Sequence, residues 1–155
     1  MKRVIIFVVL ICLGVATAAQ KRTPNQYNKN HQPHGRFIYY YDRAEGIVHS
    51  AGRYKNGKPV GRWITYHENG RKYNRTRHFK NRAREVRFYP SGKLEKKGWS
   101  KLLLDDPAQL RYYWDGKWKL YDENGKLFRV LIFSEGKVID IVKNLNPDIE
   151  SIEME

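Results

Sequence analysis

Histidines and acidic residues are the side chains from which metal or acid–base chemistry could be built in this sequence. His31 and His34 are three positions apart and could share a metal ion, but two ligands are too few for a structural zinc site. His67 and Glu68 begin a His-Glu-x-x-His zinc motif that has no second histidine. We interpret His31 and His34 as solvated, and we predict no metal ligand and no cofactor.

Paired carboxylates, which could act as a general acid and base, occur at Asp105-Asp106 and Asp122-Glu123. Both pairs lie where we predict turns, in which carboxylates commonly face water. The sequence has no Gly-x-Ser-x-Gly nucleophile motif and no phosphate-binding glycine loop. We therefore predict a protein that is not an enzyme and has no catalytic residues.

Positive charge is concentrated in one segment of the chain. The 155 residues include 30 Lys and Arg against 16 Asp and Glu, for a formal net charge of +14. Residues 71–101 hold 12 basic and 2 acidic side chains, whereas residues 102–155 hold 7 basic and 11 acidic ones. Arginine gives bidentate contacts to phosphate, sulfate or carboxylate groups. The residues that we predict to bind an anion or a partner are Arg71, Lys72, Arg75, Arg77, Lys80, Arg82, Arg84 and Arg87.

Two other interpretations of this basic segment stay open. Its cationic side chains could simply face water and protect a sheet from edge-to-edge pairing. Alternatively, the acidic residues near the end of the sequence could lie on it. Those residues are Asp148, Glu150, Glu153 and Glu155.

The first 19 residues have the pattern of a signal peptide. Two basic residues precede an apolar run over residues 4–15, and Ala16-Thr17-Ala18 supplies the small residues of a cleavage site. The run is shorter than the roughly 20 apolar residues of a membrane span, which counts against an anchor. Cys12 follows Ile11, not a small residue, which counts against a lipoprotein signal. Because Cys12 is the only cysteine, the mature chain has none and cannot form a disulfide.

From Gly35 onward, short segments with aromatic and β-branched residues alternate with turn dipeptides. Glycine adopts the positive φ that tight hairpin turns need, and Asn or Asp before it suits a type I′ turn. The alternation predicts a chain of β-hairpins. The dipeptides are Asn56-Gly57, Asn69-Gly70, Ser91-Gly92, Asp115-Gly116, Asn124-Gly125 and Glu135-Gly136.

The predicted hairpins resemble one another. Residues 63–71 match residues 118–126 at the Trp, Tyr, Glu, Asn, Gly and basic positions. Residues 86–93 form a weaker copy, in which we place Val86 where the others have Trp or Phe. In the turn before this copy, we place Arg82 where the other turns have glycine. The residues predicted to be structural in the repeat are Trp63, Tyr66, Gly70, Tyr89, Gly92, Trp118, Tyr121 and Gly125.

These residues carry a family resemblance. The pattern aromatic-x-Asn-Gly-Lys-x-x-Gly-x-Trp-x-x-Tyr-x-x-Asn-Gly, complete from Tyr54 to Gly70, resembles the variant MORN repeat (MORN-2 type). Bacterial proteins with such repeats are commonly described as YwqK-type antitoxins of toxin–antitoxin systems. The resemblance covers roughly residues 35–140 and implies a repeat scaffold, with an antitoxin or immunity-like role against a cognate toxin as one function.

A lone hairpin cannot bury its aromatic face, so successive hairpins must stack side by side. We predict an all-β, single-domain fold of stacked antiparallel β-hairpin repeats that form one elongated, twisted meander sheet. Trp63 and Thr65 should share one face of their strand, while Ile64 and Tyr66 share the other. The expected divisions are a signal peptide (1–19), a polar linker (20–34), the repeat domain (35–142) and an acidic tail (143–155).

Two details complete the expected architecture. Residues 102–107 are an insertion, with a turn or short helix beginning at Asp106-Pro107, and the last strand should span residues 137–142. The mature chain should have no transmembrane span.

We expect an exported binding or scaffold module of the bacterial periplasm, cell envelope or extracellular space. Its partner would be an unknown protein or an anionic envelope component, such as a lipid headgroup, lipopolysaccharide or cell-wall polymer. A nucleic acid also suits the charge, but export disfavours it.

Overall fold

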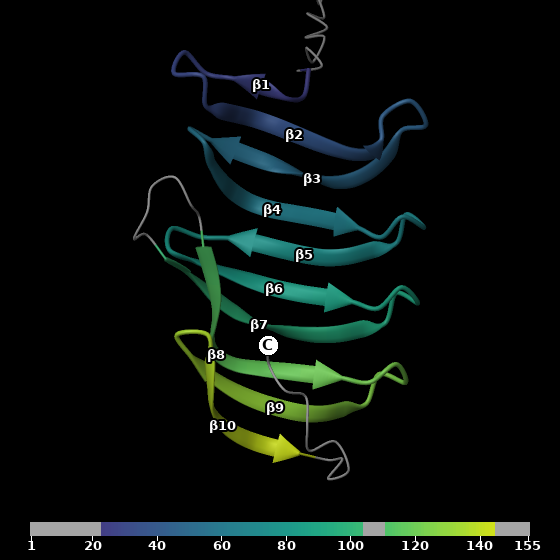
Figure 1. The fold of residues 1–155 in the computed structure, drawn as a ribbon, viewed down its shortest axis with the longest axis vertical. Coiled ribbons are helices and arrows are strands. Elements are labelled where there is room, and N and C mark those ends of the chain that lie inside the picture. The colour runs from purple at the N-terminus through teal and green to yellow at the C-terminus, as the bar shows by residue number, and fades with distance from the viewer. Residues whose placement is uncertain (1–22, 104–110, 145–155) are drawn as a thin grey trace, which may run out of the picture.

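A single antiparallel sheet forms the fold (Figure 1). The structure is a computed structural model that describes residues 23–103 and 111–144, and every regular element in these ranges is a β-strand. Each strand pairs with the next one along the chain, which confirms the predicted all-β meander of stacked hairpins. The strands are β1 (Gln26–Tyr27), β2 (Pro33–Asp42), β3 (Ile47–Lys55), β4 (Lys58–Tyr66), β5 (Lys72–His78), β6 (Arg82–Phe88), β7 (Leu94–Leu103), β8 (Arg111–Tyr121), β9 (Leu127–Ser134) and β10 (Lys137–Asn144).

The sheet extends beyond the predicted repeat domain at both ends. β1 and the start of β2 lie inside the segment that we expected to be a linker. The side chain of Asn25 fastens this segment to β2: it accepts a hydrogen bond from the N–H of Ile38 at 2.7 Å and donates one to the carbonyl of Ile38 at 2.9 Å. β10 continues two residues past Val142. The predicted signal peptide, the turn or helix at Asp106-Pro107 and most of the acidic tail lie outside the described residues.

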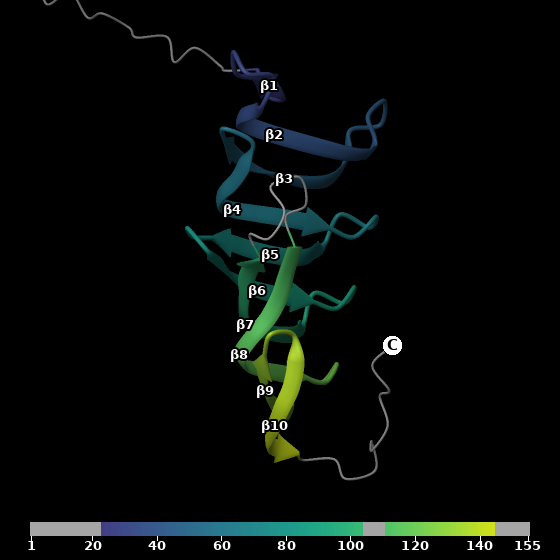
Figure 2. The ribbon, with the colours of Figure 1, turned by 60° about the vertical axis from the view of Figure 1, so that its left-hand side comes forward.

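Asp115-Gly116 is not a turn, contrary to the prediction, but a bend inside β8. Gly116 has a φ of 69°, and Gly61 bends β4 in the same way with a φ of 64°. At both places the pairing with the preceding strand shifts register. The first part of β8 consequently turns across the direction of the central strands (Figure 2). Tyr112 of β8 reaches His78 of β5, with 3.2 Å between its hydroxyl and Nδ1.

The confirmed turns are of two kinds. At Asn56-Gly57 and Glu135-Gly136 both residues have positive φ, as in a type I′ turn. The turns on the opposite side of the sheet have positive φ only at the glycine, whose N–H bonds to the carbonyl three residues earlier. This is a type I turn followed by a left-handed glycine. These turns are centred on residues 67–71, 89–93 and 122–126.

Two tryptophans of the repeat lie directly over glycines of the preceding strand. A Cβ on Gly52 would overlap the indole of Trp63, and a Cβ on Gly98 would overlap that of Trp118. In each case the indole N–H donates to the backbone carbonyl of the residue after the glycine, at 3.0 and 2.8 Å. Glycine is needed at these positions because any side chain would displace the indole.

Aromatic rings gather in two clusters on this face of the sheet, which we call the aromatic face. In the first, Tyr54 contacts Phe37 and Trp63 at centroid distances of 5.0 and 4.9 Å. In the second, Trp114 stacks on Trp118 at 4.2 Å. The second cluster forms the buried core with residues of β9, since Trp118, Leu131 and Phe133 are each at most 9% exposed. The aromatic residues of this face are therefore divided into two separate clusters.

The middle of the aromatic face is polar. In the row of paired residues that starts at Trp63, β5 supplies Thr76 and β6 supplies Glu85. Glu85 accepts a hydrogen bond from Ser100, which is fully buried. The prediction that Val86 replaces the aromatic residue is wrong by one position, since Val86 is buried on the opposite face, paired with Arg75.

Candidate functional site

The face opposite the aromatic clusters carries most of the basic segment. Alternate residues of a strand point to opposite faces, so Arg75 and Arg77 of β5 share a face, as do Arg82 and Arg84 of β6. Arg77 is paired directly with Arg62 of β4 and with Arg84. We call Arg62, Arg77 and Arg84 the arginine row. The strand spacing of about 4.8 Å places these three side chains side by side across adjacent strands.

The arginine row has no acidic counterpart among the described residues. All three side chains are exposed, and no described ion pair includes them. The described ion pairs are Lys96–Glu95 at 3.3 Å and Lys101–Asp115 at 3.1 Å. Like charges directly opposite on neighbouring strands repel. The row is therefore a local concentration of positive potential that an external anion could neutralise.

Two adjoining hollows lie on this face. The smaller, of about 270 Å³, is lined by the arginine row, Arg75 and Val86. The larger, of about 710 Å³, shares Arg75, Arg84 and Val86 with it, and we call it the basic groove. Its floor is apolar and its rim cationic. The groove residues are Tyr66, Gly70, Arg71, Lys72, Arg75, Arg84, Val86, Phe88, Gly92, Leu94 and Lys97.

Two aromatic rings border the arginine row. The guanidinium carbon of Arg82 lies 4.5 Å from the ring centre of Trp99, and that of Arg77 lies 5.5 Å from the ring of Phe79. Phe79 is 45% exposed although it is a large apolar side chain. Cation–π contacts hold guanidinium groups in fixed orientations at such surfaces. The arginine row, the basic groove, Arg82 and these two rings together form the basic surface.

Three of the predicted binding residues lie apart from the arginine row. Arg87 is on the aromatic face, where its guanidinium carbon is 4.9 Å from the ring centre of Tyr73. Lys80 is in the β5–β6 turn and lines a separate cavity of about 460 Å³ with His78 and Tyr112. Arg71 stays at the rim of the basic groove, where its Nη1 donates to the carbonyls of residues 90 and 91 at 3.3 and 2.8 Å. The other five share the face of the arginine row but not one position: Arg75, Arg77 and Arg84 line the smaller hollow, Lys72 lines the basic groove, and Arg82 lies against Trp99.

Sequence reasoning missed two basic residues of the basic surface. Arg62 completes the arginine row from a neighbouring repeat, and Lys97 lines the basic groove from β7. Strand alternation alone puts Arg62 in phase with Ile64, on the face opposite Trp63. That signal was present in the sequence, but only the strand register shows that Arg62 faces Arg77.

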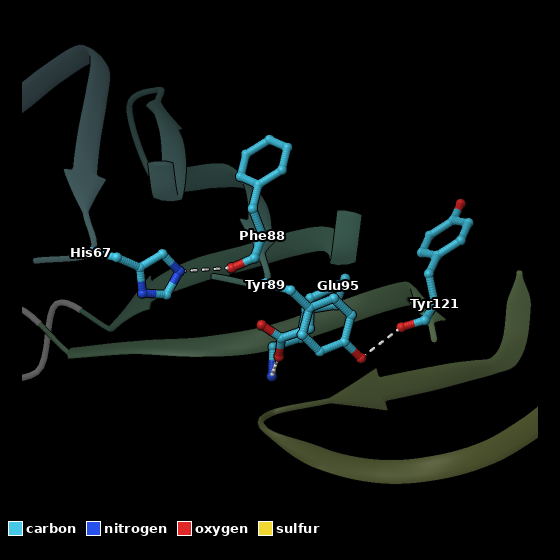
Figure 3. Close-up of polar contacts among 6 residues, drawn as sticks. His67, Phe88, Tyr89, Glu95 and Tyr121 are labelled. Carbon is cyan, nitrogen blue, oxygen red and sulfur yellow. Dashed lines mark hydrogen bonds and ion pairs between the residues drawn. The ribbon is translucent and has the colours of Figure 1, made fainter. Parts of the chain in front are cut away.

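A ladder of side chain to backbone hydrogen bonds joins the ends of successive hairpins. His67 Nε2 lies 3.2 Å from the Phe88 carbonyl, and the hydroxyl of Tyr89 donates to the Tyr121 carbonyl at 2.9 Å (Figure 3). The backbone N–H of His67 and that of Tyr89 close equivalent turns. Tyr89 therefore corresponds to His67 in the repeat, and Phe88 corresponds to Tyr66. Burial, with the nearby carboxylate of Glu95, raises the pKa of Tyr89.

The remaining predicted structural residues have defined places. Gly70, Gly92 and Gly125 are the left-handed residues of equivalent turns, with φ of 75°, 88° and 87°. Tyr66 lines the basic groove, and its carbonyl accepts a hydrogen bond from the hydroxyl of Tyr41 at 3.1 Å.

Residues 114–138 match the MORN repeat variant. This range begins at Trp114 in β8 and ends at Val138 in β10, so it contains the second tryptophan cluster and both following hairpin turns. No curated protein and no solved structure matches the chain. The described residues contain no group of three His, Cys, Asp or Glu arranged to hold a metal ion. They also contain no helix that is long and apolar enough to cross a membrane.

Proposed function

We propose that this protein is an exported, non-enzymatic β-repeat binding module whose basic surface contacts an anionic surface of the bacterial cell envelope. The observation that supports the proposal is the arginine row, in which three exposed guanidinium groups face one another without an acidic partner among the described residues. Repulsion between these guanidinium groups destabilises the free protein, and a bound anion relieves that repulsion. The signal-peptide pattern supports a partner outside the cytoplasm.

Retention on vesicles tests this function. The chain is mixed with anionic phosphatidylglycerol vesicles or neutral phosphatidylcholine vesicles and sedimented at low and high salt. We expect retention by the anionic vesicles only, with loss at about 0.5 M salt because the Debye length shrinks to a few ångströms. Equal retention on both vesicle types would disprove the proposal. Stronger retention by double-stranded DNA than by vesicles at the same salt would assign the basic surface to nucleic acid.

A matched pair of variants separates a specific surface from overall charge. In the first, the arginine row is replaced by serine; in the second, Lys29, Arg43 and Lys126, which lie on turns, are replaced by serine. Both lose the same charge. We expect about a tenfold loss of vesicle affinity for the first and little change for the second, because only the first removes adjacent guanidinium groups. Equal losses would show that net charge alone drives retention.

The second candidate function is the YwqK-type antitoxin or immunity role, in which the sheet covers a cognate toxin. The apolar side chains exposed on the last strand favour a protein partner: Ile139, Ile141 and Val142 are 64%, 53% and 56% exposed. β10 is also the open edge of the described sheet. Affinity capture with the intact chain and with an Ile139→Lys, Ile141→Lys variant tests this role. A toxin-like partner retained only by the intact chain would support it, and capture that does not depend on these residues would contradict it.

A further inference from the structure

The basic groove is amphipathic, a property that a site for a simple anion does not need. Val86, at the floor, is only 8% exposed, and Phe88 and Leu94 are partly buried beside it. Arg75 and Arg84 stand exposed at the rim. Apolar floors favour apolar ligand groups, and cationic rims favour acidic ones. The complementary ligand is therefore an extended segment that carries both.

The sequence of this chain contains such a segment directly after β10. Residues 145–155 carry four acidic side chains, Asp148, Glu150, Glu153 and Glu155, interspersed with apolar ones that include Ile149, Ile152 and Met154. The segment contains no basic residue. Its structure lies outside the described residues, but its composition and its point of attachment are known.

The point of attachment is aligned with the groove. Backbone pairing links Lys143 of β10 to Val130, then to Lys119, to Lys97 and to Val86 on successive strands. β10 therefore ends in the row that crosses the floor of the basic groove. It also runs toward the side of the sheet that carries the turns at 67–71 and 89–93, which border the groove (Figure 1). Four strand spacings of about 4.8 Å separate β10 from β6, whereas eleven extended residues span about 36 Å.

We propose that the basic groove is the docking site of residues 145–155 of the same chain. The carboxylates pair with Lys72, Arg75, Arg84 and Lys97 at the rim, and the apolar side chains cover Val86 and Phe88. The docked segment neutralises part of the basic surface. Its regulatory consequence, competition with an anionic partner, rests on the proposed function, whereas docking itself does not.

A labelled peptide of residues 144–155 tests docking by fluorescence anisotropy. The receptors are the intact chain and a full-length variant whose own segment is neutralised by Asp148→Asn, Glu150→Gln, Glu153→Gln and Glu155→Gln. We expect the peptide to bind the neutralised variant about tenfold more tightly, because the native segment no longer competes for the groove. Equal affinity for both receptors, or no binding to either, would overturn the proposal.

Two controls identify the groove and the chemistry of its ligand. Arg75→Ser with Arg84→Ser in the neutralised receptor should weaken peptide binding about tenfold, whereas Lys29→Ser with Arg43→Ser should not, since neither Lys29 nor Arg43 lines the basic groove. A peptide with Ile149, Ile152 and Met154 changed to serine keeps every carboxylate. It should bind about tenfold more weakly if the apolar floor takes part. Unchanged binding of that peptide would overturn the proposed docking mode.

Vesicle retention distinguishes this proposal from the proposed function. The neutralised variant should be retained by anionic vesicles at a salt concentration that releases the intact chain. Peptide binding without vesicle retention of either protein would leave docking supported and remove the proposed function. Vesicle retention without peptide binding would leave the proposed function supported and remove the docking proposal.

Discussion

At the scale of single residues, the contact between Gly98 and Trp118 decides how the second aromatic cluster packs. The indole occupies the space that a Cβ would fill, and its N–H bonds to the backbone carbonyl of the next residue. Gly98→Ala should therefore lower the free energy of unfolding by about 1–3 kcal/mol through overpacking. Urea denaturation monitored by tryptophan fluorescence measures this change.

A double variant shows whether overpacking is the cause. Trp118→Leu frees space above residue 98, so Gly98→Ala should cost less in that background than alone. If the losses of stability from the two substitutions are additive, the cost of Gly98→Ala comes from weaker strand pairing and not from overlap with the indole. The same test applies to Gly52 and Trp63, where the geometry repeats.

His78 makes stability depend on pH. Burial lowers the pKa of its imidazole in the folded protein. Between that value and the ordinary pKa of about 6.5, the unfolded chain binds a proton that the folded chain does not. The free energy of unfolding should therefore fall as the pH drops below about 7. Denaturation curves from pH 8 to pH 5 measure the slope.

His78→Gln should reduce this slope, because the side chain no longer titrates. His34→Gln is the matched control, since His34 is exposed on β2. A slope that His78→Gln leaves unchanged, or that both variants reduce equally, would assign the pH dependence to other groups.

At the scale of the strand, the arginine row predicts that part of the basic surface destabilises the fold. Arg84 faces Arg77 across β5 and β6, and threonine suits an exposed strand position. Arg84→Thr should therefore raise the free energy of unfolding by up to about 1 kcal/mol at low salt. The gain should shrink at high salt because screening already weakens the repulsion. Thermal unfolding at two salt concentrations measures both effects.

Lys117→Thr is the control for the arginine row. Lys117 is exposed on β8 and pairs with Ile132, so its removal lowers the net charge without relieving a directly opposed charge. A similar gain from both variants would mean that overall charge, and not the row, limits stability. A gain unique to Arg84→Thr would show that the protein keeps a destabilising arrangement on its surface.

The strands and most turns follow from the sequence because they depend on local chemistry. Turn glycines such as Gly70 and the two-residue periodicity mark most hairpins without any tertiary information, although the β5–β6 turn has no glycine. Asp115-Gly116 misled the prediction because a left-handed glycine serves a bend within a strand as well as a turn. Glu85 takes the aromatic position because Trp63 pairs with Thr76 and Thr76 with Glu85, and this register between strands is not contained in any single strand sequence.

The basic surface was predictable in part, because the alternation of side chains along a strand is also local. Spacings of two within β5 and β6 already place Arg75 with Arg77 and Arg82 with Arg84 on shared faces. Arg87 is three residues after Arg84 and must therefore lie on the opposite face of the sheet. A count of charges along the segment does not separate the two faces. The apolar floor of the groove depends on pairing between strands, which no single strand sequence contains.

At the scale of the whole molecule, stacked hairpins contact only their neighbours, so stability is expected to vary along the sheet. The two aromatic clusters lie at opposite ends, one around Trp63 in β2–β4 and the other around Trp118 in β8–β10. The strands between them carry polar groups on the same face, including Glu85 and Ser100. A polar centre buries less apolar surface and couples the two ends weakly.

Weak coupling predicts that the two ends lose structure separately. Trp118→Ala should speed amide hydrogen exchange in β8–β10 by more than tenfold, since removing a buried tryptophan costs about 3–5 kcal/mol. β2–β4 should keep their protection, and Trp63→Ala should give the reverse pattern. Exchange followed by mass spectrometry of peptides from each end measures both. If either variant exposes all ten strands together, the polar centre transmits stability as well as the aromatic clusters do, and the sheet folds as one cooperative unit.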